Sequence, residues 1–168
     1  AAMPEITTIG WIHTGLAIVA LVAGFYTLVT RKVITPRSGS GRLYLVCTFI
    51  VAATALMIYQ RGAFGPGHAL AVLTLLALVA GLVVTRISFL KGASPYLEAL
   101  CFSATLLFHM IPAITDGLLR LPVGDPVLSD PTDPLLRNFY LLFLAIFIVG
   151  YIFQVMWLKK QPPAESGA

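Results

Sequence analysis

The chain has 168 residues, of which 58% are hydrophobic and only 11% are charged. Soluble domains carry about 25% charged residues, so this composition argues against an ordinary soluble domain and indicates an integral membrane protein with one domain. The formal net charge is +4. Because the basic residues alternate with apolar runs instead of gathering on one polar surface, we predict the lipid bilayer as a partner and no nucleic acid.

Five apolar segments follow one another along the chain. Each is near the ~20 residues that cross a hydrocarbon layer of ~30 Å. We therefore predict an all-α fold, an integral membrane bundle of five transmembrane helices in a single domain over residues 1–168. The predicted spans cover Thr7–Thr30, Leu43–Gln60, His68–Leu90, Tyr96–Leu119 and Asn138–Leu158.

The first segment carries a stripe of small residues with one histidine in it, at spacings of three and four residues: Gly10, His13, Ala17, Ala20 and Gly24. Small residues let helices approach closely in lipid, so His13 is predicted to face the bundle. Glu5 precedes the segment and Arg31 follows it. A secretory signal has its positive charge before the apolar run, so we expect a retained span.

Two connections and one isolated polar residue carry further local predictions. The stretch Arg37–Arg42 alternates serine and glycine and is predicted to be a flexible loop. Gly62, Gly65, Pro66 and Gly67 predict a tight turn after the second span. Gln154 is the only strongly polar side chain deep in the fifth segment, so we expect it to bond to another helix.

The fourth segment holds the most informative pattern. Glu98, Thr105, His109 and Asp116 follow one another at spacings of seven, four and seven residues. At about 100° per residue these side chains share one helix face. Ionisable groups inside a membrane-length segment are costly and mark functional faces, so this stripe admits a proton or cation path. Pro112 is expected to kink the helix beside His109.

The loop Leu121–Pro134 after this segment is the largest extramembrane piece. Its four prolines predict a rigid, non-helical cap over the mouth of the bundle. Its aspartates, at positions 125, 130 and 133, match no calcium-loop spacing, so we expect a solvated structural loop.

Basic residues set the predicted orientation. With five crossings, eight of them fall on one side of the membrane, and the other side holds three basic residues and most of the acidic ones. The positive-inside rule then places the N-terminus outside and the C-terminus in the cytoplasm. The eight are Arg31, Lys32, Arg37, Arg42, Arg86, Lys91, Lys159 and Lys160, and the three are Arg61, Arg120 and Arg137.

All three histidines then lie toward the outer side. His13 and His109 lie at similar depths on separate helices, about 10 Å from the outer ends of their spans at 1.5 Å per residue. Two such imidazoles can ligate a haem iron on its two axial sides. Together with Asp116 they can instead hold a divalent metal, with His68 at the outer interface as a weaker candidate ligand.

Two stretches together resemble a known group of proteins. One is Gly41-Arg42-Leu43-Tyr44, and the other is Phe108-His109-Met110-Ile111-Pro112 with the following Thr115–Pro122. They are similar to uncharacterised small bacterial membrane proteins, a domain-of-unknown-function family with multi-helix bundles and intramembrane histidines. In that pattern a histidine stands four residues before the Gly-Arg pair, where this chain has Arg37. The resemblance implies a multi-pass protein of the bacterial inner membrane.

These observations lead to two functional hypotheses. The first is an accessory or binding subunit of a larger membrane complex, with other membrane-protein subunits as partners and a haem or metal at the outer histidines. The alternative is proton- or cation-coupled transport along Glu98, Thr105, His109 and Asp116. A non-enzymatic role is favoured, because Ser103 lies in a span without an assigned base and no nucleophile elbow is present.

Overall fold

A computed structural model of the chain describes residues 5–58 and 62–162, and within these ranges the fold is all-helical. Four of the helices are long and apolar enough to cross a membrane, which indicates a multi-pass membrane protein. The fifth, α2, is apolar but has only 17 residues. The helices are α1 (Thr8–Arg31), α2 (Gly39–Ala55), α3 (Pro66–Val84), α4 (Ser94–Arg120) and α5 (Pro134–Lys159), with a short 3₁₀ helix, η1 (Ser88–Leu90), after α3.

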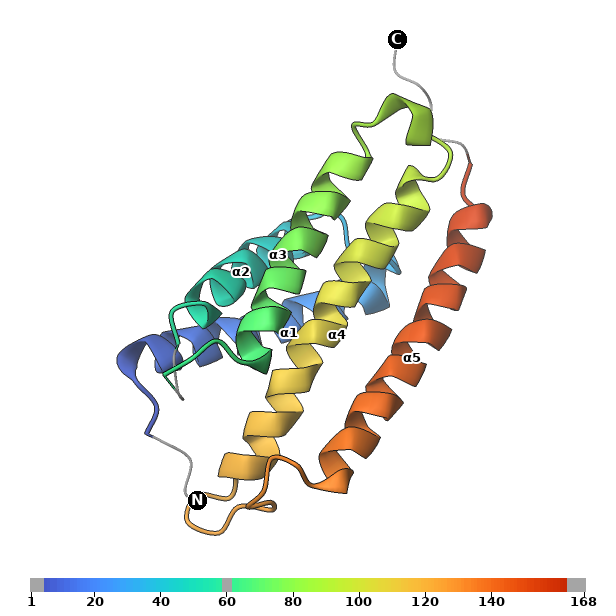
Figure 1. Ribbon diagram of the computed structural model, residues 1–168. Helices are drawn as coiled ribbons and strands as arrows, with labels where there is room; N and C mark the ends of the chain where they lie inside the picture. The colour runs from blue at the N-terminus through green and yellow to red at the C-terminus, as the bar shows by residue number, and fades with distance from the viewer. Residues whose placement is uncertain (1–4, 59–61, 163–168) are drawn as a thin grey trace.

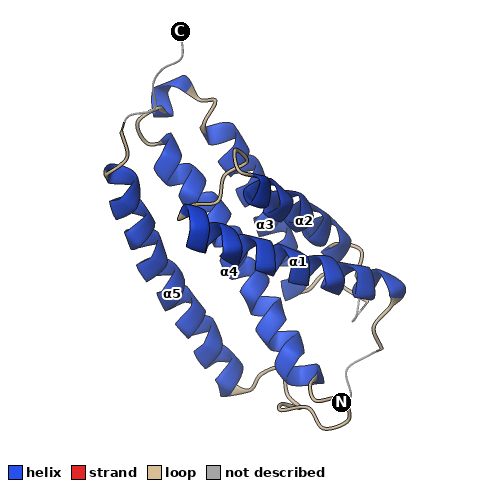
Figure 2. Cartoon of the chain, turned by 180° about the vertical axis from the view of Figure 1, so that it is seen from behind, coloured by secondary structure: helices blue, strands red, loops and turns tan. Residues whose placement is uncertain are grey.

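The helices form two groups. Helices α3, α4 and α5 lie side by side in chain order, and the α1–α2 hairpin crosses one face of this row (Figures 1 and 2). The main contacts join α1 to α2, α3 to α4, α5 to α4 and α2 to α3. The hairpin therefore packs on the row mainly through α3, and α4 lies between α3 and α5.

Capping explains why several helices begin earlier than the apolar pattern predicts. Helix α2 begins at Gly39 because the Ser38 hydroxyl accepts a hydrogen bond from the Gly41 backbone N–H at 3.1 Å. The end of the predicted flexible loop Arg37–Arg42 is thus the first turn of a helix. The predicted tight turn likewise ends in a helix, since Pro66 is the first residue of α3.

The second and third segments also end earlier than predicted. After Ala55 the chain tightens, as Met57 and Ile58 bond to carbonyls three residues back instead of four. The predicted end of this span, Gln60, and the neighbouring Arg61 lie outside the described residues. Helix α3 ends at Val84 for the same reason, since Arg86 and Ile87 bond three residues back.

The loop between α4 and α5 is shorter than predicted. Pro134 is the first residue of α5, where its missing N–H costs nothing, and the Asp133 carboxylate caps the helix by accepting from the Leu135 N–H at 2.8 Å. The expected non-helical stretch 121–134 therefore ends at Asp133. The Thr132 backbone N–H and hydroxyl bind the Asp130 carboxylate and lower its pKa, as in a solvated structural turn.

The core lies between the hairpin and the α3–α4 pair. Tyr44 and Phe102 are fully buried there with Leu78, Leu106 and Ala20. Two glycines make this packing possible: a Cβ at Gly24 would meet the Tyr44 ring at 2.9 Å, and one at Gly81 would meet the Phe102 ring at 2.5 Å. The small-residue stripe of α1 is confirmed in this respect, since Gly10, Ala20 and Gly24 are buried.

Helix α5 exposes nearly all of its apolar surface, with only Leu136 and Gln154 buried. Gln154 confirms the expected bond to other helices: it accepts from the Ser103 hydroxyl at 2.9 Å, and its Nε2 donates to the Lys32 carbonyl at 2.9 Å. Large exposed apolar side chains also cover α1 and α3. Surface of this kind is unfavourable in water and suits a lipid environment.

We predict that Gly81→Ala and Gly24→Ala destabilise the fold by about 1–3 kcal/mol each, the usual cost of overpacking a core. The rigid rings of Phe102 and Tyr44 are fully buried and have no room to yield. Thermal or denaturant unfolding in detergent measures the loss. Gly15→Ala and Gly150→Ala are matched controls, because a Cβ at either position meets nothing within 4 Å. Equal unfolding midpoints for all four variants would contradict the packing described.

Candidate functional site

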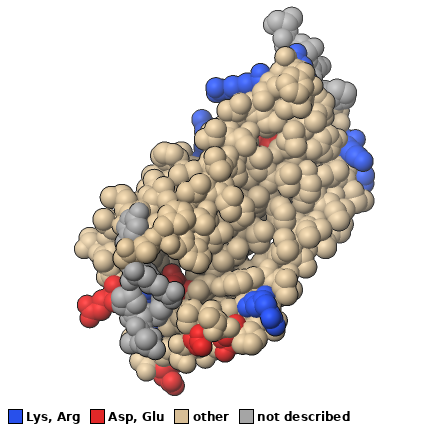
Figure 3. All heavy atoms as spheres, viewed as in Figure 1, with Lys and Arg blue, Asp and Glu red and all other residues tan. Residues whose placement is uncertain are grey.

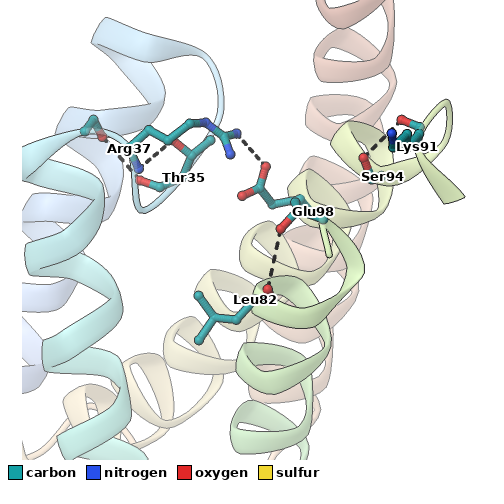
Figure 4. A network of polar contacts seen from close by, with 8 residues as sticks. Thr35, Arg37, Leu82, Lys91, Ser94 and Glu98 are labelled. Carbon is teal, nitrogen blue, oxygen red and sulfur yellow. Dashed lines mark hydrogen bonds and ion pairs between the residues drawn. The ribbon is translucent and has the colours of Figure 1, made fainter. Parts of the chain in front are cut away.

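The stripe predicted on α4 faces α2 and the loop before it. Glu98, at one end of the stripe, has a side chain only 3% exposed, and it accepts from the Arg37 guanidinium at 2.7 Å (Figure 4). Arg37 comes from the α1–α2 loop and is itself 65% exposed. The buried carboxylate is therefore neutralised by an ion pair that opens toward solvent. This ion pair joins the α1–α2 hairpin to α4.

About two turns further along α4, Thr105 forms the next contact. Its hydroxyl donates to the Phe102 carbonyl at 2.6 Å, so its one proton is used. The Tyr44 hydroxyl lies 2.7 Å from the Thr105 Oγ1 and must therefore be the donor in that pair. Both residues are fully buried.

The same reasoning extends to His109. The Thr48 Oγ1 lies 3.0 Å from the His109 Nε2, and the Thr48 hydroxyl also interacts with that of Tyr44. Because Tyr44 gives its proton to Thr105, a Thr48 hydroxyl that bonds to Tyr44 can only donate, and we then expect His109 to donate to Thr48 from Nε2. With this assignment the bonds all run in one direction, from His109 to the Phe102 carbonyl. We call Thr105, Tyr44, Thr48 and His109 the polar row.

His13 on α1 bonds to α2, not to lipid, as predicted. Its Nδ1 lies 3.0 Å from the Val51 carbonyl and 3.0 Å from the Thr54 hydroxyl. A carbonyl can only accept, so Nδ1 carries the proton and the Nε2 lone pair stays available. By the assignment above, His109 keeps its lone pair on Nδ1. Each imidazole is thus oriented by a hydrogen bond at one ring nitrogen and keeps a lone pair on the other.

The structure brings His13 into electrostatic range of both His109 and Asp116. These three residues are the outer cluster. Burial increases along it: the Asp116 side chain is 53% exposed, His13 is half-buried and His109 is buried. Asp116 also lies 3.8 Å from Arg120 one turn further along α4. The cluster therefore has an open end at Asp116 and a closed end at His109.

His68 is not part of this cluster. It lies at the start of α3, where its Nδ1 accepts from the Gly65 N–H at 3.0 Å and its ring stacks on Phe64 at 5.2 Å between ring centres. This is a helix-capping role. Its use as a metal ligand stays a prediction.

Sequence reasoning missed the partners on α2. Tyr44, Thr48 and Thr54 supply the hydroxyls that orient the predicted histidines. Tyr44 and Thr48 are four residues apart and thus share a helix face, and matching this face to the α4 stripe would have found them. Arg37 was assigned to topology alone, and no local pattern marks it as the partner of Glu98.

The cluster fits a metal or haem only in part. Two imidazoles with free lone pairs and oriented second nitrogens are typical of metal ligands. However, no group of three or more His, Cys, Asp or Glu in the described ranges is arranged to hold a metal ion. The large apolar pocket of the protein is lined by none of the three cluster residues.

Comparison with protein-family models, curated proteins and solved structures finds no match to this chain.

We predict opposite neutral tautomers for the two histidines, Nδ1–H for His13 and Nε2–H for His109. Nitrogen-15 NMR of histidine-labelled protein in lipid bilayers distinguishes them by the shifts of the ring nitrogens. Thr48→Val should remove the bond that fixes His109 and change the signals of His109 alone, while Thr30→Val is the matched control on the surface of α1. An Nδ1–H tautomer for His109 in the parent protein would contradict the direction of the polar row.

Proposed function

We propose that the chain crosses the membrane five times, with its N-terminus outside and its C-terminus in the cytoplasm. Helix α2 is the shortest of the five proposed spans, and its 17 residues reach about 26 Å at 1.5 Å per residue. This nearly matches a hydrocarbon layer of ~30 Å. The charge distribution supports the orientation: most of the basic side chains visible in Figure 3 lie toward the end with η1 and the end of α5, and most of the acidic ones lie toward the opposite end.

This orientation predicts which loops an impermeant thiol reagent labels in intact cells. Ser129→Cys, in the exposed α4–α5 loop, should be labelled from outside. Gly92→Cys, exposed between η1 and α4, should be labelled only after the membrane is opened. The parent chain is the control, since Cys47 is buried and Cys101 is half-buried. Labelling of both positions from outside would refute the five-span topology.

We further propose that the protein binds and releases protons at the outer cluster, from one side of the membrane. The observation that carries this is the gradient of burial from Asp116 through His13 to His109, three titratable groups in electrostatic range. A proton that arrives at the exposed carboxylate finds an imidazole lone pair at each deeper step. Imidazole nitrogens both accept and release protons, which is their common role in proton transfer.

The polar row supports a one-sided site over a path through the membrane. Its last acceptor is the Phe102 carbonyl, which has no proton to pass on. Glu98, the inner member of the predicted stripe, bonds to Arg37 and not to the row. Transport along the whole stripe would need water or a rearrangement between Glu98 and Thr105.

Proton exchange predicts that the loss of one cluster histidine reduces proton uptake. His109→Gln should reduce the protons taken up by the purified protein in a pH jump, because the closed end of the cluster no longer titrates. Thr30→Val should leave the uptake unchanged, since it lies on the exposed surface of α1 and removes no titratable group. A pH-indicator dye or isothermal titration calorimetry measures the uptake. Equal uptake by the parent and by His109→Gln would rule out the proposal.

The accessory subunit with a haem or metal is the second candidate, and the free lone pairs of His13 and His109 favour it. Absorption spectra and metal analysis of protein purified from its native membranes distinguish the two. A Soret band, or one metal per chain that His109→Gln removes, would replace proton exchange as the function. Proton flux across liposomes that Glu98→Gln abolishes would instead favour transport along the stripe.

A further inference from the structure

A groove of about 720 Å³ runs between α1, α4 and α5, on the side of α4 away from the polar row. Its walls are apolar over most of its length, and it is much larger than a packing defect. Phe25 from α1, Leu106 and Met110 from α4, and Phe143 and Phe147 from α5 are among the wall residues. The size and the lining suit a flexible apolar chain.

One end of the groove differs in chemistry from the rest. Lys32 follows the end of α1 and Lys160 follows the end of α5, and both line the groove together with Trp157 and Gln154. The Gln154 Nε2 donates to the Lys32 carbonyl at 2.9 Å and so holds the two helix ends together. Two positive charges and an aromatic ring therefore meet where the apolar walls stop.

The conformation of Lys32 contributes to this arrangement. Its φ of 68° is in the left-handed region, which residues other than glycine rarely adopt. Its ammonium group donates to the Val29 carbonyl at 2.8 Å, which uses one of its three N–H donors. The remaining donors are available to an anion at the end of the groove.

We propose that this groove binds an anionic phospholipid, with an acyl chain along the apolar walls and the phosphate between Lys32 and Lys160. The charge of the groove selects this occupant. A zwitterionic lipid brings no net charge to the lysines, and an apolar partner helix would bury them without a counter-ion. Basic pockets between membrane helices hold anionic headgroups, and tryptophan lies at headgroup level.

The test is native mass spectrometry of the full chain released from nanodiscs of phosphatidylglycerol or of phosphatidylcholine. We expect phosphatidylglycerol to be retained and phosphatidylcholine to be lost. The double variant Lys32→Asn/Lys160→Gln should weaken phosphatidylglycerol retention roughly 30-fold, as expected for two lysines near an anionic headgroup. Asparagine is chosen because it tolerates the left-handed conformation.

Two further variants separate headgroup and chain binding. Lys91→Gln removes an exposed lysine outside the groove and should leave retention unchanged. Gly150→Leu places a side chain in the groove, where a Cβ meets nothing within 4 Å, and should block the acyl chain without unfolding the protein. Unchanged thermal unfolding of each variant shows that the fold is intact.

Equal retention of the two lipids by the parent protein would overturn the proposal. The same holds if the double variant retains phosphatidylglycerol as the parent does. A lipid-free dimer that Gly150→Leu disrupts would assign the groove to a helix of another chain and would also overturn it. Since none of these measurements involves His13, His109 or Asp116, their outcome is independent of proton exchange.

Discussion

Polar groups between α2 and α4 must find hydrogen-bond partners inside the protein, because a lipid environment offers none. An unpartnered hydroxyl or imidazole there would cost several kcal/mol. Tyr44 shows how the chain meets this constraint: its ring packs beside Gly24 in the apolar core, and its hydroxyl joins the polar row. Through its ring and its hydroxyl, Tyr44 joins the hairpin both to the apolar core and to Thr105 on α4.

The same constraint gives the row its direction. Hydroxyl groups both donate and accept, so a row of them can in principle run either way. The short bond from Thr105 to the Phe102 carbonyl removes that freedom, and each earlier member then has one role. The polar row ends at the Phe102 carbonyl, whereas the outer cluster ends at the half-exposed Asp116 carboxylate. This difference is the physical basis for the proposed exchange from one side.

The amino-acid sequence predicts the helices well because apolar length is a direct signal. It predicts their ends less well, since caps such as Ser38 and Asp133 extend a helix beyond its apolar core. The small-residue stripe predicts that His13 faces the bundle, and the isolated polarity of Gln154 predicts that it bonds to another helix. The structure confirms both predictions. Each prediction uses the sequence of one helix only.

Contacts between helices were harder to predict. The pairing of Arg37 with Glu98 joins residues 61 positions apart, and Thr48 with His109 spans the same separation. Neither pair follows from spacing along one helix, because each depends on how the hairpin crosses α4. The stripe on α4 contains one residue of each pair, Glu98 or His109. The partner residue is evident only from the fold.

The two proposed sites lie on different faces of helix α4. Glu98, Thr105 and His109 face the hairpin, whereas Ser103, Leu107 and Met110 face the groove beside α5. Leu106 belongs to the core and also lines the groove, so the two faces meet at that side chain. The packed core between the faces keeps an apolar chain in the groove away from the histidines. The proposed proton site and the proposed lipid site therefore share one helix without sharing a ligand.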